Sequence, residues 1–383
     1  MSTSDKTPVP PPSVAPRLIG AHMPTSGGLY TSLTGGAEIG CSAVQLFTCS
    51  PRQWSHPALK AQDIAQFLDV QEQTGITLTV AHDSYLINLA APSEEILLKS
   101  KSAFRSEMDR ADQLNIQWLV THMGAHLDQS ESEALDRLAE SLRQILEATD
   151  SAGHRVGIAL ETTAGQGTGL GWRFEQLGKI LADVGEHPRL GVCLDTCHIF
   201  VAGYELRDRD SYEETWAEFN SLIGYNKLKV IHANDAKKPL GSRVDRHEHI
   251  GRGEIGIEPF SWLVTDHRLK HVPVIVETPD ADTMHSVNVA KLHRLSAGQS
   301  PLKTIEIQLY GHYSEITADG PMVIRVPYDF IVEDVVAELE KKDPRLTHLA
   351  GHCRFAVNEE YCEITSNMVD GDSLAVLPPV SGG

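Results

Sequence analysis

The sequence has no long hydrophobic segment: no apolar run in its 383 residues approaches the roughly 18 residues that a membrane-spanning helix requires. The opening segment, MSTSDKTPVPPPSVAPR, has no apolar core of the kind found in secretory signals. The six cysteines form no CxxC pair and are too sparse for a disulfide framework, so we expect reduced thiols packed as small apolar groups. These absences together predict a cytoplasmic protein without membrane contact.

Positive charge is also scarce, with 33 Lys and Arg against 52 Asp and Glu and a formal net charge of −19. Taken alone, this composition disfavours nucleic-acid binding, because contacts to phosphate depend on cationic surface. The exclusion does not hold if several carboxylates bind divalent ions, since each ion returns positive charge to the cleft that holds it. The 18 histidines are a large supply of nitrogen donors for such ions. The net charge therefore does not decide whether the protein binds nucleic acid.

Short apolar runs alternate with longer segments of helical periodicity between Arg17 and Leu295. Strands that alternate with helices indicate parallel βα units with right-handed crossovers. Eight such units predict an α/β fold, the (βα)8 or TIM barrel, over residues 17–295. A doubly wound open sheet is the alternative. The expected strands are 17–22, 43–48, 76–82, 116–122, 156–161, 190–195, 227–232 and 272–277.

The pattern changes on either side of this barrel. Residues 1–16 are rich in Pro, Ser and Thr and are expected to be a disordered arm. The segment SAGQSPL (296–302) is typical of a linker. In 303–383, TIEIQLYGHYSEI and PMVIRVP alternate with period two like a hairpin, FIVEDVVAELEKKDP is one amphipathic helix, and RFAVNEEY and SLAVLPP follow as strands. This order predicts a small α+β module with a β-grasp, ubiquitin-like fold.

The last residue of each expected strand from the third to the eighth is a His, Asp or Glu, the residue types that bind metal ions. The carboxyl ends of barrel strands share one face, so these side chains should converge. A lone histidine at a strand end is usually structural, but six donors in a row predict a metal cluster. His198 lies one helical turn after Asp195, and Asp245 and His247 lie in a long loop after the seventh strand. The nine candidate ligands are His82, His122, Glu161, Asp195, His198, His232, Asp245, His247 and Glu277.

Nitrogen and oxygen donors without thiolate suit zinc or manganese at a catalytic site. Nine ligands are more than one ion needs, and three ions with about three ligands each would use them all. Clusters of metal ions a few ångströms apart act on phosphate esters, where they activate water and neutralise phosphate oxygens. No Ser-centred triad is then needed for hydrolysis.

Eight motifs of the barrel segment resemble the endonuclease IV family of apurinic/apyrimidinic (AP) endonucleases: GAH (20–22), FTCSPRQW (47–54), AHDSYLINLA (81–90), THMGAH (121–126), ETTAGQGTGLG (161–171), GVCLDTCHIFVAGYELR (191–207), HANDAKKPLGSRVDRHEHIGRGEIG (232–256) and IVETP (275–279). The resemblance implies three zinc ions, with manganese as the alternative at one position. It also implies hydrolysis of the phosphodiester 5′ to an abasic site in duplex DNA, leaving a 3′-hydroxyl.

The same resemblance implies a ligand set for each ion. The first ion would be bound by His82, His122 and Glu161, the second by Glu161, Asp195, His232 and Glu277, and the third by His198, Asp245 and His247. Glu161, as the bridge between two ions, and Glu277 are the candidate catalytic residues.

Arg52, Tyr85 and Leu86 match family positions that enter the base stack and expose the abasic sugar. Ordinary packing under a loop is the other interpretation of Tyr85 and Leu86. Candidate supports for the ligands are His22, His126, Asn234 and Asp235, with plain structural histidines as the alternative for the first two. Candidate phosphate contacts, or else an ordinary solvated loop face, are Lys237, Lys238, Arg243, Arg246 and Arg252. The sequence departs from the family at Thr162, at Cys49-Ser50 and at Glu248, which bears on DNA affinity and on lesion preference.

The last 81 residues resemble the small subunit of molybdopterin synthase and the sulfur-carrier proteins of thiamine synthesis. The similarity lies in RFAVNEEY, in MVDGDSLAVLPPVSGG and in the terminal Gly382-Gly383, which has no side chains and can thread a narrow tunnel. It implies a terminal carboxylate that is adenylated and converted to a thiocarboxylate; a protein-modifier role and a degenerate docking domain are the alternatives. The implied partners are an adenylating and sulfurating enzyme and a molybdopterin synthase large subunit.

The sequence predicts a monomeric fusion of a DNA-repair nuclease with a sulfur carrier. A sugar isomerase or epimerase on a related barrel is the first alternative, but it needs only one or two ions and leaves His198, Asp245 and His247 unexplained. The second alternative is an inactive barrel that serves the tail.

Overall fold

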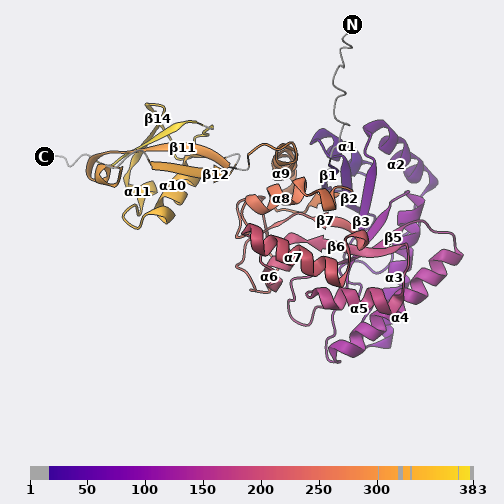
Figure 1. Cartoon of the computed structure of the whole chain (residues 1–383). Coiled ribbons are helices and arrows are strands. Elements are labelled where there is room, and N and C mark those ends of the chain that lie inside the picture. Colours follow the sequence, from indigo (N-terminus) through magenta and orange to yellow (C-terminus); the bar gives the residue numbers. More distant parts are fainter. Residues whose placement is uncertain (1–16, 301, 318–321, 328–329, 370, 380–383) are drawn as a thin grey trace, which may run out of the picture.

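The computed structural model describes residues 17–300, 302–317, 322–327, 330–369 and 371–379, and it contains a barrel followed by a small sheet domain (Figure 1). The expected arm at 1–16 and the terminal Gly382-Gly383 lie outside these residues. Within the described segments, every helix is too short or too polar to cross a bilayer. All six cysteines have free thiols.

Eight parallel strands close into a barrel in the order β1-β10-β7-β6-β5-β4-β3-β2. Every neighbouring pair is parallel, which confirms the TIM barrel and makes the open-sheet alternative wrong. Most strands begin one or two residues later than expected, and the last ends before Glu277. Their bounds are β1 Ile19–His22, β2 Ala43–Phe47, β3 Leu78–His82, β4 Trp118–His122, β5 Gly157–Glu161, β6 Leu190–Asp195, β7 Leu228–His232 and β10 Val274–Val276.

Helices surround the barrel and pack their apolar faces on it (Figure 1). In α4, Leu135, Leu138, Leu142 and Ile145 recur at helical spacing and are buried, and a capping box between Ser130 and Glu133 fixes the first turn. The helices are α1 Thr31–Glu38, α2 Ala61–Thr74, α3 Glu94–Gln113, α4 Glu131–Ser151, α5 Phe174–Val184, α6 Thr196–Ala202, α7 Arg209–Leu222, α8 Glu258–Thr265 and α9 Ala281–Ser296, with short 3-10 turns at Tyr225–Lys227 and His267–Leu269.

A compact apolar layer fills the barrel interior beneath the strand ends. It consists of small or β-branched side chains and one thiol, namely Ala43, Val80, Val120, Ala159, Cys193, Val230 and Ile275. The lumen is therefore a packed core, and the polar groups above it have a rigid floor.

The small domain has its own core and a five-stranded sheet in the order β12-β11-β15-β13-β14. The α+β sheet module is confirmed, but two of its expected details are wrong. GHYSEIT is a 3-10 segment, Gly311–Thr317, rather than part of a strand. RFAVNEEY folds back at Asn358 and Glu359, whose φ angles are positive, so it forms two strands. The elements are β11 Leu302–Leu309, β12 Met322–Pro327, α10 Val332–Lys342, α11 Leu349–His352, β13 Arg354–Val357, β14 Glu360–Cys362 and β15 Ser373–Leu377.

Gly20 in β1 is required by the close approach of β2. A Cβ at this position would lie 1.7 Å from the Ala43 carbonyl oxygen, so Gly20→Ala must displace backbone. We expect a loss of about 1–3 kcal/mol in the free energy of unfolding of the barrel, as for other overpacked cores. Equilibrium unfolding in urea would measure this loss in the free energy of unfolding. In Gly35→Ala, the new methyl meets only the flexible Met23 Cε at 3.2 Å, and this control should stay within about 1 kcal/mol of the parent.

Candidate metal centre

The nine candidate ligands converge at one end of the barrel. Five of them close β3, β4, β5, β6 and β7, and Glu277 is the residue immediately after β10. Seven of the nine line a cavity of about 310 Å³, while Asp195 and His232 are fully buried beside it. The donor atoms of each ligand set expected from the sequence lie within 4.8 Å of one another.

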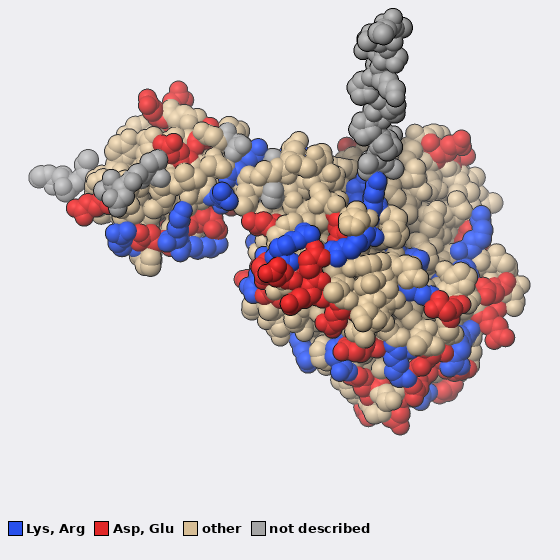
Figure 2. All heavy atoms as spheres, viewed as in Figure 1, with Lys and Arg blue, Asp and Glu red and all other residues tan. Residues whose placement is uncertain are grey.

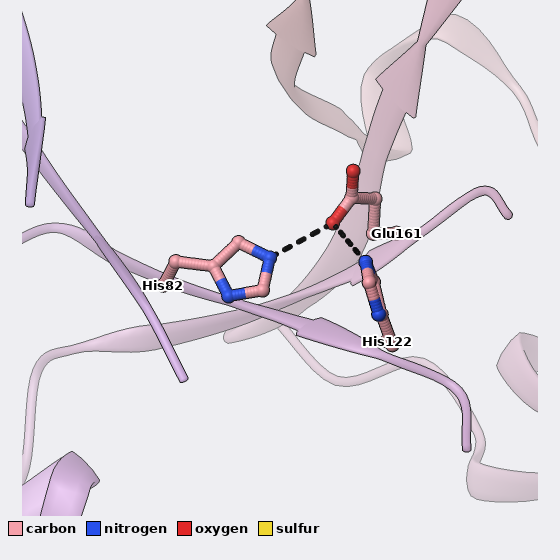
Figure 3. Close-up of side chains that lie close together, drawn as sticks. All are labelled: His82, His122 and Glu161. Carbon is pink, nitrogen blue, oxygen red and sulfur yellow. Dashed lines mark hydrogen bonds and ion pairs between the residues drawn. The ribbon is translucent and has the colours of Figure 1, made fainter. Parts of the chain in front are cut away.

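The first group consists of His82, His122 and Glu161 (Figure 3). The Nε2 atoms of His82 and His122 lie 3.0 and 3.1 Å from Glu161 Oε2. Figure 3 shows the two imidazoles pointing at this one carboxylate oxygen from different strands. A cation between the two nitrogens and the oxygen would take the place of these contacts.

Glu161 also belongs to the second group, together with Asp195, His232 and Glu277. Its other oxygen, Oε1, lies 3.0 Å from His232 Nδ1, and Glu277 Oε2 lies 3.1 Å from the same nitrogen. The two oxygens of one carboxylate thus face two different donor groups. This is the geometry that a bridging ligand requires.

His198, Asp245 and His247 form the third group. Asp245 Oδ2 lies 3.2 Å from His198 Nε2, and Asp245 Oδ1 lies 3.3 Å from His247 Nε2. Both nitrogens are buried, and neither has a partner in hydrogen-bonding geometry. Buried, unpartnered imidazole nitrogens on either side of a carboxylate fit a divalent ion.

The outer ring nitrogens of three ligands contact backbone carbonyl oxygens. Nδ1 of His82 lies 2.9 Å from the Asp83 oxygen, that of His198 lies 2.8 Å from the Thr162 oxygen, and that of His247 lies 3.0 Å from the Glu277 oxygen. Since a carbonyl only accepts, each Nδ1 carries the hydrogen. Each Nε2 is therefore the nitrogen that would give its lone pair to a bound ion.

The electrostatics of the site keep Glu161 and Glu277 ionised. Burial opposes the charged form of Glu161, but His232 and His122 outweigh it and hold its pKa well below its usual range. The pKa of Glu277 is lowered in the same way, mainly by His232. Conversely, burial opposes the charged form of His198, yet Asp195 and Asp245 raise its pKa well above its ordinary value. The cluster therefore demands positive charge, which bound cations would provide.

Two thiols lie near the ligands without joining them. Cys193 Sγ is within 4.8 Å of donor atoms of Glu161 and His232, and Cys197 is similarly close to Asp195 and His247. Burial raises the pKa of Cys193 to about 12, and burial also raises that of Cys197. Both remain neutral thiols near pH 7, which agrees with a centre built from nitrogen and oxygen.

Of the candidate DNA contacts, Tyr85 lines the cavity, Leu86 follows it in the same loop, and Arg52 lies in the loop after β2. Arg52 is exposed, Tyr85 is 62% exposed and Leu86 is half-buried. Ser84 Oγ donates a 2.8 Å hydrogen bond to the Pro51 carbonyl and so ties the two loops that carry them. The Tyr85 ring is 5.6 Å from that of Phe47 and 6.1 Å from that of His82, which places it at the edge of the cavity.

The basic residues of the loop after β7 have diverse contacts. Arg243 stacks at 4.0 Å on the Trp172 ring, Lys237 lies 3.7 Å from Glu248, and Arg246 donates to the Asp245 carbonyl at 2.6 Å. On the face of the molecule shown in Figure 2, acidic and basic side chains are interspersed rather than gathered into one basic stripe.

Two of the candidate supporting residues contact ligands directly. Asn234 Nδ2 donates to Asp195 Oδ2 at 2.7 Å, and its Oδ1 accepts from the Glu277 amide at 2.7 Å. His22 Nδ1 lies 3.3 Å from Glu277 Oε1. His126 instead contacts the Gln129 carbonyl, within the loop after β4.

Asp235 organises the loop that returns from the third group. Its carboxylate accepts hydrogen bonds from the backbone amides of Ala236, Gly251, Gly253 and Ile255 at 2.8–3.0 Å. Together with the short antiparallel pair β8 (Asp235–Ala236) and β9 (His247–Glu248), it closes the base of this loop.

Gln45 is a residue of the site that was not expected from the sequence. It is a fully buried amide on β2 that contacts His232 and Glu277. The only signal was a polar residue inside the apolar run AVQLF, and that signal does not say what the side chain contacts.

Comparison with known proteins identifies both domains. A family model described as a xylose isomerase-like TIM barrel matches residues 36–297. A "Probable endonuclease 4" of Chloroflexus aggregans is 48% identical over 278 residues, which cover 72% of this chain and 96% of the relative. The chain belongs to the endonuclease IV family. The solved endonuclease IV of Thermus thermophilus is 30% identical, with a TM-score of 0.66 over 74% of this chain and all of that one.

The other matches concern the fold and the tail. A D-tagatose 3-epimerase-like protein is 21% identical, with a TM-score of 0.57, and covers 73% of this chain and 96% of its own, which shows a shared barrel. The ThiS family model matches 307–383, so this member of the endonuclease IV family carries a ThiS domain at its C-terminus.

Thr162, one of the departures from the family pattern, accepts a hydrogen bond from the Asp195 amide through Oγ1 at 2.9 Å.

Asp235→Asn should loosen the loop after β7. Burial raises the pKa of Asp235 to about 7, and its two oxygens accept from four amides. An NH2 group in place of one oxygen leaves buried amides without an acceptor, at about 1–3 kcal/mol. We expect faster hydrogen exchange at Gly251, Gly253 or Ile255. Glu254→Gln, an exposed change in the same loop, should leave their exchange unaltered, and equal exchange in both variants would contradict this role.

Proposed function

We propose that the barrel is a zinc-dependent AP endonuclease that hydrolyses the phosphodiester 5′ to an abasic site in duplex DNA. The observation that carries the proposal is the third donor group, His198, Asp245 and His247, beside the two groups that share Glu161. Three adjacent groups are suited to a trinuclear centre, and such centres act on phosphate esters. The named relatives, probable endonuclease 4 proteins, support the same activity.

The chain's own residues would bind and orient three ions. When bound, the zinc ions lower the pKa of water and neutralise negative charge on the phosphate. Glu161 spaces the first two groups through its two oxygens, and Asn234 holds Asp195 against the strand that ends before Glu277. The backbone carbonyls behind His82, His198 and His247 fix which nitrogen faces the ions.

The net charge of −19 is compatible with a DNA substrate. Four of the acidic residues, Glu161, Asp195, Asp245 and Glu277, belong to the donor groups, so divalent ions would offset their charge at the point where a phosphate would lie. Arg52, Tyr85 and Leu86, on the loops after β2 and β3, would occupy the gap left by an extruded abasic sugar. Such a sugar is weakly stacked and leaves the helix at low energetic cost.

Metal content and cleavage together test this function. We expect about three zinc ions per chain and incision of a duplex that contains a tetrahydrofuran abasic analogue, both lost after treatment with a strong chelator. Glu161→Gln should lower kcat by at least about a hundredfold, because the carboxylate between two ions loses its charge. Glu147→Gln, on the exposed face of α4, serves as the matched control and should cleave at the parental rate.

A sugar epimerase is the second candidate, favoured by the xylose isomerase-like family model and the epimerase-like neighbour. It predicts one or two ions per chain and turnover of a ketose. One or two ions per chain, no incision of abasic duplex and epimerisation of a ketose would together decide for it.

For the ThiS domain, we propose sulfur carriage. The support is the family match over 307–383 and the sheet whose central β15 leads toward the C-terminal residues. ATP would adenylate the Gly383 carboxylate with release of pyrophosphate, and a sulfur donor would then displace AMP to leave a thiocarboxylate. An adenylating enzyme and a partner of the molybdopterin synthase large-subunit type would bind this domain.

Mass spectrometry of the intact C-terminal peptide tests the tail. After incubation with an activating enzyme, ATP and a sulfur donor, we expect the mass gain of one oxygen-to-sulfur exchange at Gly383. A chain that lacks Gly383 should show no gain. An unmodified parental terminus, in a reaction that modifies a known carrier protein, would contradict sulfur carriage.

A further inference from the structure

Gln45 is a polar side chain in an otherwise apolar strand. It lies on β2 (AVQLF), has no exposed surface, and points to the level where the apolar floor of the barrel meets the ligands. A buried amide is unfavourable unless all its groups are hydrogen-bonded. The contacts of Gln45 therefore reveal what it does.

The Gln45 amide contacts three residues. Its Oε1 lies 2.8 Å from His232 Nε2, and its Nε2 lies 2.5 Å from Glu277 Oε1 and 2.9 Å from His22 Nδ1. The direction of the amide is set by Glu277, because an ionised carboxylate only accepts and must face the NH2 group. The carbonyl oxygen of Gln45 consequently faces His232.

This orientation fixes the tautomer of His232. Because Gln45 Oε1 can only accept, His232 Nε2 must carry a hydrogen, and Nδ1 is the nitrogen that would give its lone pair to a bound ion. Nδ1 is the nitrogen that lies 3.0 Å from Glu161 Oε1 and 3.1 Å from Glu277 Oε2.

His232 thus differs from three other candidate ligands. His82, His198 and His247 place Nδ1 on a backbone carbonyl and turn Nε2 to the site, whereas His232 uses the opposite nitrogens. The outer partner of His232 is a side chain, so a point mutation can remove it.

Gln45 also gives the two carboxylate oxygens of Glu277 different partners. Oε1 accepts from Gln45, so Oε2 is the oxygen left to face His232 Nδ1 and the second donor group. One amide therefore contacts two members of that group from outside.

We propose that Gln45 is a positioning residue for the second metal, setting the tautomer of His232 and the orientation of Glu277. This inference rests on the metal centre of the proposed function. Outer partners of metal ligands typically account for 10–100-fold in metal affinity, and Gln45 serves two ligands at once.

Two variants separate the hydrogen bonds from the space that the side chain fills. Gln45→Met keeps an unbranched chain of similar length and removes both hydrogen bonds. Gln45→Glu keeps an acceptor for His232 Nε2 but sets a carboxylate against Glu277. Thr79→Val is the matched control, since Thr79 is equally buried, on β3, and its hydroxyl contacts Gln117, away from the ligands.

Zinc titration in competition with a chromogenic chelator provides the readout, with metal content after dialysis as a second measurement. For the parent and Thr79→Val we expect three tightly bound ions. For Gln45→Met and Gln45→Glu we expect two tightly bound ions. The remaining ion, at the second donor group, should bind with a dissociation constant raised about 10–100-fold. The zinc-dependent rise in Tm should shrink correspondingly in both Gln45 variants, because a weaker ligand stabilises the fold less.

The outcomes distinguish this role from a structural one. Three ions bound to Gln45→Met within threefold of the parental affinity would overturn the proposal, as would an equal loss in Thr79→Val. If Gln45→Met fails to fold by circular dichroism, Gln45→Glu decides in the same way. A folded parent that binds no zinc would instead refute the metal centre itself.

Discussion

The gathering of four carboxylates and five imidazoles at one end of the barrel, five of them buried and four half-buried, is the constraint on which the rest of the structure depends. Such a concentration of charge is unfavourable in a low-dielectric interior unless opposite charges and hydrogen bonds offset it. Glu161 is central to this balance, because its two oxygens each face a different set of imidazoles. Asn234, Gln45 and three backbone carbonyls then satisfy the outer atoms of the cluster.

The barrel fold and the convergence of the ligands could be predicted from the sequence because both follow from chain periodicity. Parallel strands that end in His82, His122, Glu161, Asp195 and His232 must present these residues at the same face, whatever the helices do. The positions of Asp245 and His247 could not be predicted from periodicity, since both residues lie in a loop. Their position was expected from the family resemblance and from the length of the loop.

What escaped sequence reasoning depends on side-chain direction or on single backbone angles. Gln45 could have been an ordinary buried amide until its two ends were seen to face His232 and Glu277. In the small domain, the extra strand arises because Asn358 and Glu359 adopt positive φ, which neither composition nor alternation reveals. The barrel and this domain nonetheless have separate apolar cores, as expected of two modules joined in one chain.

The four amides gathered by Asp235 have a consequence for how this loop can vary. The base of the loop is closed by Asp235 and by the β8–β9 pair, and residues 239–244 at its tip are tied to α6 through the backbone amides of Gly241 and Arg243. The loop is therefore held at its base and at its tip. A change in its length would have to break one of these attachments and would displace Asp245, the donor that directly follows the tip.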